Sequence, residues 1–486
     1  MYLSSRTRPA PPLEAPEPDD VMLGAPAPDE LEVAGEPPPS ARTSGAEDHD
    51  VEAERTGLEG NVVGLGVTSM FTDISAEMVG SVLPLYLTVL YGFTPLQLGI
   101  FDGFYQSLAA LIALGAAVMA DRRRRLKGMA VAGYALSTVS TLGLVGAQGA
   151  WAASVGFLYT DRMGKGIRTA PRDAIISLSV VRGRLARAFG LHRAFDTVGA
   201  VAGPLIASMV LARNINGYQS VFTVAFFASV IGLAALVFFV DGRRRALLDP
   251  ARDPDPAAGA VPGERRSRWF ARTRRDIGVL VALPTFRRAL LLGGGLALLS
   301  PGDGLLYLTF QRSSDLTFAQ FPLLYVGGAL VFLLSAYPVG RLADRIGRWR
   351  VFIAGEAMFV GVFVVLASGL RGTGALVVLL VLLGGRYAAT DGVLIAVASS
   401  TLPSHLRTTG LGVLVAVIAF GHMFASTLYG SLWGSLGGEE ASRVFAIALG
   451  VVTLAGVLLL RHRPLSGGAL KARPSTVDVG AREEGW

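Results

Sequence analysis

The first long apolar run of the chain, residues 61–90, carries two carboxylates, Asp73 and Glu77. Side chains four residues apart lie on one face of a helix. Two close carboxylates with little water around them resist double ionisation, so one of them would hold a proton near neutral pH. This spacing favours a proton-binding pair. The alternative is that both are structural counter-ions of buried arginines.

The fourth apolar run, residues 151–178, is the most charged of all. If Trp151 marks a membrane surface, Asp161, Arg162 and Lys165 lie about 15 Å deeper, at about 1.5 Å per helical residue. An arginine keeps its proton, so Arg162 needs a carboxylate or an anionic substrate as its partner. We interpret these three residues as a substrate or proton-relay cluster, against the alternative of an ion-pair lattice that fixes the helix. For Arg172 and Asp173, nearer the end of the run, we favour the structural role.

Two further groups of ionisable side chains lie in later apolar runs. His192 and Asp196 are four residues apart and form a candidate titrating pair, although they could equally lie at the inner mouth of the protein. Asp303 directly follows Pro301 and Gly302, two residues that predict a break in a helix.

The tenth run holds Arg386 and Asp391, a reduced version of the cluster in the fourth run. We expect Asp102, in the second run, to lie near the outer membrane surface, where a carboxylate costs little. His422 is expected to be a packing residue whose ring nitrogens are satisfied. The candidate pathway residues are therefore Asp73, Glu77, Asp161, Arg162, Lys165, His192, Asp196, Asp303, Arg386 and Asp391.

The composition says what kind of element carries these residues. Apolar residues make up 51% of the 486-residue chain and charged residues only 17%, against about 25% in soluble domains. Apolar runs of 18 or more residues predict membrane spans. Twelve such runs lie at residues 61–90, 96–120, 128–147, 151–178, 188–212, 220–240, 287–311, 319–340, 351–370, 375–400, 408–434 and 441–460. The fold class predicted is an all-α membrane protein with twelve transmembrane helices.

Basic residues in alternate loops predict the orientation of these spans. Arginine clusters fill the loops near residues 122–127, 182–187, 243–275 and 345–350, while the loops between them hold one arginine or none. The positive-inside rule then places both termini and the central loop in the cytoplasm. The net charge of +7 is thus a topology signal and needs no nucleic-acid partner. The expected location is the bacterial inner membrane, with multiple crossings.

The chain divides into five predicted segments. Residues 1–58 are rich in Pro, Glu and Asp and predict a disordered cytoplasmic arm without the features of a signal peptide. Residues 59–241 and 287–461 each predict a six-helix bundle. A basic cytoplasmic loop, residues 242–286, joins the bundles, and residues 462–486 predict a disordered tail.

The two bundles repeat one sequence pattern at a nearly constant offset in residue number. The pairs of matching positions are Leu85–Thr88 with Leu306–Thr309, Thr94 and Gln97 with Thr317 and Gln320, Asp121 and Arg122 with Asp344 and Arg345, and Arg162 with Arg386. Several matches in order at nearly one offset indicate a duplicated six-helix unit. Parallel six-helix repeats form the architecture of major facilitator transporters.

Three motifs carry a resemblance to the major facilitator superfamily. Residues 340–350, Gly-Arg-Leu-Ala-Asp-Arg-Ile-Gly-Arg-Trp-Arg, resemble the family's cytoplasmic loop signature, and residues 117–125 resemble a degenerate copy without its glycines. Residues 162–166 are similar to the family's fourth-span signature, with Lys165 in place of Gln. Residues 199–204 resemble the fifth-span motif of proton-coupled exporters, with Ala207 where a Gly is typical. Residues 72–78 and 161–174 further resemble a prokaryotic subgroup whose substrate is unassigned.

The resemblance implies roles for two further groups of residues. It implies a cytoplasmic gate at Asp121, Arg122, Gly340, Asp344, Arg345, Gly347 and Arg348. Gly199, Gly203 and Pro204 form a helix-packing motif, because small residues one turn apart let helices approach closely.

The function expected is secondary active transport of a small solute by alternating access, with the proton as the coupling ion and antiport export as the favoured direction. One alternative is an importer of a small anion, suggested by the basic residues of the fourth run. Another, of a different class, is a membrane receptor or scaffold that transports nothing. The chain is not expected to be an enzyme, because no catalytic nucleophile motif or phosphate loop is present. It has no cysteine, and no metal, cofactor or catalytic residue is expected; its partners would be the solute, the proton and the bilayer, with the protein a monomer.

Overall fold

The computed structural model describes residues 44–123, 126–147, 149–180, 184–214, 216–241, 275, 278–390, 402 and 406–462. The chain divides into two units, residues 1–51 and 52–486. The described part of the first unit, residues 44–51, is helical. All that follows concerns the second unit. Asp391, most of the central loop and the C-terminal tail lie outside the described residues, as do the side chains of Asp121 and Arg122.

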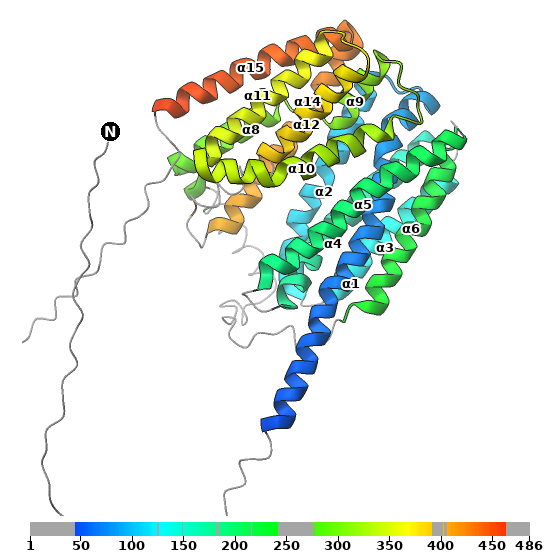
Figure 1. Ribbon diagram of the computed structural model, residues 1–486, viewed down its shortest axis with the longest axis vertical. Helices are drawn as coiled ribbons and strands as arrows, with labels where there is room; N and C mark the ends of the chain where they lie inside the picture. Colours follow the sequence, from blue (N-terminus) through cyan, green and yellow to red (C-terminus); the bar gives the residue numbers. More distant parts are fainter. Residues whose placement is uncertain are drawn as a thin grey trace, which may run out of the picture. The chain divides into compact units, whose positions relative to one another are not determined.

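Every regular element among the described residues is a helix, in line with the predicted all-α class (Figure 1). The first half consists of α1 Ser44–Leu85, the π-helical turn η1 Tyr86–Leu90, α2 Pro95–Arg123, α3 Leu126–Gly146, α4 Trp151–Leu178, α5 Leu185–Arg213 and α6 Tyr218–Phe239. The second half consists of α8 Pro284–Ala297, α9 Asp303–Arg312, α10 Pro322–Ile346, α11 Arg348–Ala367, α12 Thr373–Thr390, α14 Arg407–Leu436 and α15 Gly438–His462. Helix α1 begins at Ser44, within the segment for which the sequence predicts an arm without structure.

Ten helices in the described part of the chain are long and apolar enough to cross a membrane. The two other predicted crossings fail that criterion for identifiable reasons. Helix α4 carries six charged side chains between Asp161 and Asp173. Helices α8 and α9 have only 14 and 10 residues, because the chain breaks between Ala297 and Asp303. The helix break predicted at Pro301 and Gly302 is thereby confirmed, whereas the number of twelve spans stays a prediction.

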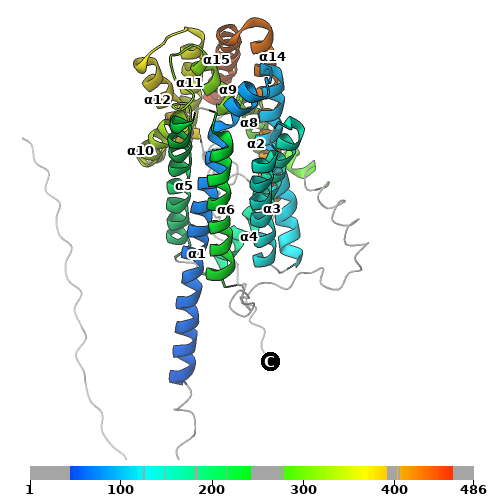
Figure 2. The same ribbon diagram turned by 90° about the vertical axis from the view of Figure 1, so that its right-hand side faces the viewer.

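The helices of each half pack mainly on one another (Figures 1 and 2). In the first half α3 lies between α4 and α6, and in the second half α11 contacts α12 and α15. The halves meet where α2 packs on α14 and α5 packs on α10. We call the end at which α2 begins and α14 ends the Pro95 end.

Backbones touch where α2 crosses α14 near the Pro95 end. A Cβ atom on Gly99 would overlap the Ser426 carbonyl, and one on Gly430 would overlap the Pro95 carbonyl. Further along α2, the Ser107 hydroxyl donates to the Ala419 carbonyl at 2.6 Å. Because α2 and α14 belong to different halves, this contact brings side chains of both halves close together beside α2.

Candidate functional site

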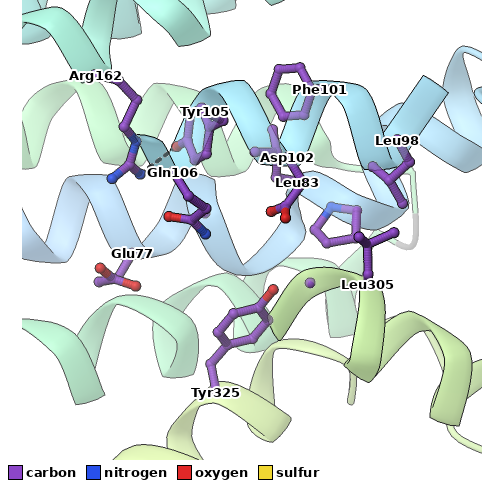
Figure 3. Close-up of a pocket in the computed structure, with 13 residues that line it drawn as sticks. Glu77, Leu83, Leu98, Phe101, Asp102, Tyr105, Gln106, Arg162, Leu305 and Tyr325 are labelled. Atoms are coloured by element: carbon purple, nitrogen blue, oxygen red, sulfur yellow. Dashed lines mark hydrogen bonds between the residues drawn. The ribbon is translucent and has the colours of Figure 1, made fainter. Parts of the chain in front are cut away.

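A cavity of about 90 Å³ lies between the halves (Figure 3). Helices α1, α2 and α4 of the first half and α9 and α10 of the second half supply its walls. Its polar lining residues are Glu77, Asp102, Tyr105, Gln106, Arg162 and Tyr325. The remaining wall is apolar or glycine, from residues such as Leu83, Phe101 and Leu305. Polar groups thus make up about half of the lining, and placed polar groups of this kind can orient a small solute.

Arg162 is the basic residue among those that line the cavity, and the structure buries it to 8% exposure. Its Nη2 donates to the Tyr105 hydroxyl, and its guanidinium lies 4.0 Å from the centroid of that ring. Asp161 Oδ2 lies 3.9 Å from Arg162 Nε, an ion pair too long for a hydrogen bond. Nε has no hydrogen-bond partner among the described residues. Arg162 is therefore held in place yet retains an unused donor.

The two carboxylates of α1, four residues apart on one helix, have different surroundings in the structure. Asp73 Oδ1 lies 4.0 Å from Arg168 Nη2, and Arg168 is only 4% exposed. Glu77 lines the cavity and has no basic group within 4.0 Å among the described residues. The cations that act on Glu77 from farther away are Lys165 and Arg162. Asp73 thus has the surroundings of a counter-ion, and Glu77 those of a cavity group.

Gly199 and Gly203 hold α5 against α1 at the level of these carboxylates. A Cβ atom on Gly199 would lie 2.6 Å from the Met70 carbonyl oxygen and 3.0 Å from Asp73 Cβ. One on Gly203 would lie 2.7 Å from the Ile74 carbonyl oxygen and 2.9 Å from Glu77 Cβ. Real Cβ contacts are not that short, so only glycine fits. The packing motif therefore fixes the position of Glu77 relative to α5.

The remaining first-half candidates lie away from the cavity lining. His192 Nε2 is 3.6 Å from Asp196 Oδ1, and His192 is only 2% exposed. Neither ring nitrogen has a hydrogen-bond partner among the described residues. Arg172 pairs with its neighbour Asp173 at 2.9 Å, the arrangement of a structural ion pair. A transport role for His192 and Asp196 stays a prediction.

The second half gathers Asp303 and Arg386 in a separate polar cluster. The Tyr387 hydroxyl donates to Asp303 Oδ1 at 2.7 Å. Arg386 Nη2 donates to Ser300 Oγ at 3.1 Å, and its guanidinium lies 3.6 Å from the centroid of the Phe359 ring. Neither Asp303 nor Arg386 lines the cavity, although Gly304 and Leu305 beside Asp303 do.

Two carboxylates differ from what the sequence led us to expect. We expected Asp102 near the outer membrane surface, where a carboxylate costs little; the structure buries it to 8% exposure, in the lining of the cavity. Ser426 of α14 and Gly302 cover its carboxylate, and the hydropathy of the α2 run alone does not register such contacts. Glu356 was not singled out at all, yet it is 4% exposed, with Oε2 lacking a hydrogen-bond partner among the described residues. Its place as the lone acid inside residues 351–370 was the signal that could have identified it.

His422 behaves as a packing residue, because its Nδ1 lies 2.7 Å from the Ser300 carbonyl oxygen, the geometry of a hydrogen bond. The gate residues of the second half lie far from the cavity lining, where α10 ends and α11 begins. Asp344 Oδ1 is 3.6 Å from Arg348 Nη2, and the two side chains are 72% and 56% exposed. Gly347 between the helices has a φ of 100°, which suits glycine. In this conformation Asp344 pairs inside its own half.

Sequence comparison finds relatives that align over most of this chain. An uncharacterised MFS-type transporter of Methanocaldococcus jannaschii is 28% identical over 411 residues, which cover 83% of this chain and 95% of the relative. An uncharacterised protein of Mycobacterium tuberculosis is 26% identical over 408 residues, 82% of this chain and 93% of the relative.

Solved structures show the same fold at low sequence identity. A POT family transporter in complex with 5-aminolevulinic acid aligns with a TM-score of 0.68 at 14% identity, over 84% of this chain and 96% of that one. A nucleoside transporter aligns with a TM-score of 0.63 at 13% identity, over 82% and 99%.

The sequence model of one transporter family matches the chain twice, at residues 65–311 and 291–481. The two matches together cover both halves, including every helix that lines the cavity. With a cavity between two repeated halves, and with matches to that model over most of its length, the chain belongs to the Major Facilitator Superfamily.

Proposed function

We propose that this membrane transporter moves a small solute outward in exchange for protons, through the cavity between its two halves. The observation that carries the proposal is that Glu77 and Arg162 both line that cavity, an acid and a base without a direct ion pair between them. A site at the interface of two repeats is where alternating access can expose a solute to one side and then the other.

Glu77 is the proposed proton carrier, in preference to Asp73. Holding an ionised carboxylate in a place with little water costs several kcal/mol unless a cation or a proton compensates it. Arg168 compensates Asp73 at 4.0 Å. Glu77 has only the more distant Lys165 and Arg162, and Arg162 is shared with Asp161 and Tyr105. A proton on Glu77 would leave the two cations free to act on another group.

Twelve crossings are proposed for the chain, with α4 and the broken pair α8–α9 added to the ten apolar spans. The charges of α4 can be tolerated inside a membrane because they face protein: Arg162 and Arg168 are buried to 8% and 4% exposure. Both termini and the basic central loop are then cytoplasmic, and the Pro95 end faces outward. A cytoplasmic reporter fused near residue 255 should give signal, and a periplasm-only reporter should not. The reverse result contradicts the topology.

The alternative is import of a small anion. Arg162 retains an unpartnered Nε, and Lys165 has no ion pair among the described residues. An anionic group could bind both when Glu77 is protonated. Export remains our choice because residues 199–204 resemble the fifth-span motif of proton-coupled exporters, with Ala207 where a Gly is typical.

A transport assay in membrane vesicles of both orientations tests these proposals. A panel of labelled small solutes is screened with and without an imposed pH gradient, using vesicles that lack or overproduce the protein. Export predicts accumulation in inside-out vesicles with an acidic interior, and collapse of the gradient with a proton ionophore should abolish it. Accumulation confined to right-side-out vesicles would show that the protein imports its solute. Accumulation that does not depend on the pH gradient would show that the proton is not the coupling ion.

A further inference from the structure

Three groups that line the cavity keep hydrogen-bond acceptors that no described residue uses. Glu77 has neither a hydrogen bond nor an ion pair among the described residues. The Tyr325 hydroxyl has no hydrogen-bond partner there either. The Asp102 carboxylate accepts hydrogen bonds from Ser426 Oγ, at 2.8 Å, and from Gln106, but it has no ion pair in the described part of the chain. This side of the cavity is therefore short of donors and of positive charge.

Asp102 is the least compensated of these groups. It is only 8% exposed, and the charge that acts on it comes from Asp303, which has the same sign. Arg162, the base of the lining, is already held by Tyr105 and Asp161. An ionised carboxylate in such a place needs a cation or a proton. In the empty cavity a proton can meet this need, and in the occupied cavity a cationic solute can.

The three acceptors come from both halves and border one space. Glu77 lies on α1, Asp102 on α2 and Tyr325 on α10. Figure 3 shows the Asp102 carboxylate and the Tyr325 hydroxyl turned toward each other, with Glu77 to one side. The charged and titratable groups around Asp102 on the helices packed against it are Glu77, Tyr105, Tyr159, Arg162, Asp303 and Tyr325. An ammonium group has three N–H donors and no acceptor, which complements this set of oxygens.

We propose that the cavity binds the ammonium group of a small aliphatic amine, with Asp102 as its ion-pair partner and Tyr325 as a second acceptor. A cavity of about 150 Å³ accommodates benzene, so the cavity of about 90 Å³ suits an amine of about four heavy atoms. The inference rests on the proposed exchange of a solute for protons and names the class of that solute. A cation bound at Asp102 favours the ionised form of Glu77 nearby, so the amine enters as the proton leaves.

Binding of propylammonium chloride to the purified full-length protein in nanodiscs tests the solute class at pH 8, where an alkylammonium keeps its charge. Propan-1-ol has the same length without the charge, propanoate has the opposite charge, and sodium chloride controls for ionic strength. A ligand that binds the folded state raises the unfolding temperature as its concentration increases. We expect this effect from propylammonium and not from propan-1-ol or propanoate. No effect beyond that of sodium chloride, an equal effect of propan-1-ol, or a larger effect of propanoate would overturn the proposal.

Two variants with matched controls test the anchor. Asp102→Asn keeps the size of the side chain but not its charge and should weaken propylammonium binding by about 10- to 100-fold, and Tyr325→Phe should weaken it by about fivefold. Asp73→Asn is the control for the first, because it removes a carboxylate that lies outside the lining beside Arg168. Tyr337→Phe is the control for the second, on the same helix and 67% exposed. Wild-type affinity in Asp102→Asn, or in Tyr325→Phe if the former does not fold, refutes the anchor.

Proton release separates the amine site from the proposed exchange. In weakly buffered solution the wild type should release protons as propylammonium binds, and Glu77→Gln should bind propylammonium while releasing fewer. Binding that depends on Asp102 without any proton release would keep the amine site and contradict the exchange. Gradient-driven accumulation of another solute by a protein that does not bind propylammonium would keep the exchange and refute the amine site.

Discussion

Arg162 and Arg386 occupy equivalent positions in the two repeats and have different surroundings. Arg162 faces the cavity, holds Tyr105 and has a long contact with Asp161. Arg386 lies away from the cavity, stacked on Phe359 and bonded to Ser300. Both are 8% exposed, so burial alone does not distinguish them. What differs is whether the buried charge borders space that a solute or proton can enter.

Helix packing, in contrast, is preserved between the repeats. Gly199 of α5 lies against α1, and Gly421 of α14, at the matching position of the second repeat, lies against Ala297 at the end of α8. A Cβ on Gly421 would come within 2.6 Å of Ala297 Cβ. At this pair of glycines the two repeats pack alike, while the surroundings of their arginines differ. We infer that the halves contribute unequally to transport.

Exchanging each arginine for lysine tests whether Arg162 serves transport and Arg386 serves stability, and the largest effect is expected here. Arg162→Lys should reduce transport on the order of 100-fold with little change in thermal stability, because a lysine cannot reproduce the planar guanidinium that spans Tyr105 and Asp161. Arg386→Lys should instead destabilise the protein by about 1–3 kcal/mol through loss of the Phe359 and Ser300 contacts. Transport in proteoliposomes, normalised to folded protein, and thermal unfolding are the two measurements. Equal losses of transport would show that the halves are equivalent.

Replacing the two carboxylates of α1 should have effects on transport and stability that differ nearly as much. Glu77→Gln should abolish gradient-driven accumulation and flatten the pH dependence of transport, while leaving solute exchange. Asp73→Asn should leave accumulation and its pH dependence, but lower stability by about 1–3 kcal/mol, because Arg168 loses its buried partner. Counterflow and gradient-driven uptake, compared between pH 5 and pH 8, separate these outcomes. Normal coupling in Glu77→Gln would reassign the proton to Asp303 or Asp196.

A smaller effect is expected from the packing of α5 on α1. Gly203→Ala inserts a methyl group against Ile74 and the Cβ of Glu77 and should cost about 1–3 kcal/mol of stability, together with some transport. Gly190→Ala on the same helix is the matched control, because nothing lies within 4 Å of its added Cβ. There alanine should be neutral or stabilising by up to about 1 kcal/mol. If both variants unfold at the same temperature, α5 does not hold α1 in the way described.

The smallest change in stability is expected at the gate. Asp344 and Arg348 are exposed, and such ion pairs contribute about 0–1 kcal/mol. Asp344→Asn should therefore express and unfold like the wild type while slowing the alternation of the two halves. The rate of transport in proteoliposomes measures this effect. An unchanged rate would refute the gate role that the resemblance implies for residues 340–350.

Sequence reasoning predicted the fold more completely than the site. The apolar runs and the repeat were sufficient to predict helices and their pairing into halves, because hydrophobic length is a local property. The break before Asp303 was predictable from Pro301 and Gly302 for the same reason. The burial of Asp102 was not predicted, because it depends on which helix covers that side chain. Its contact with α14, a helix of the other repeat, was not readable from the α2 run.

The sequence by itself determined that this chain spans a membrane, that it is duplicated, and that Arg162 and Glu77 are costly charges in need of a function. Only the tertiary structure decided which of these charges share a cavity. It paired Asp73 with Arg168, left Glu77 to the cavity, and joined Asp102 to the start of α9. The physical reason is that a helix fixes which residues share a face, whereas the neutralisation of a buried charge depends on the helix that packs opposite.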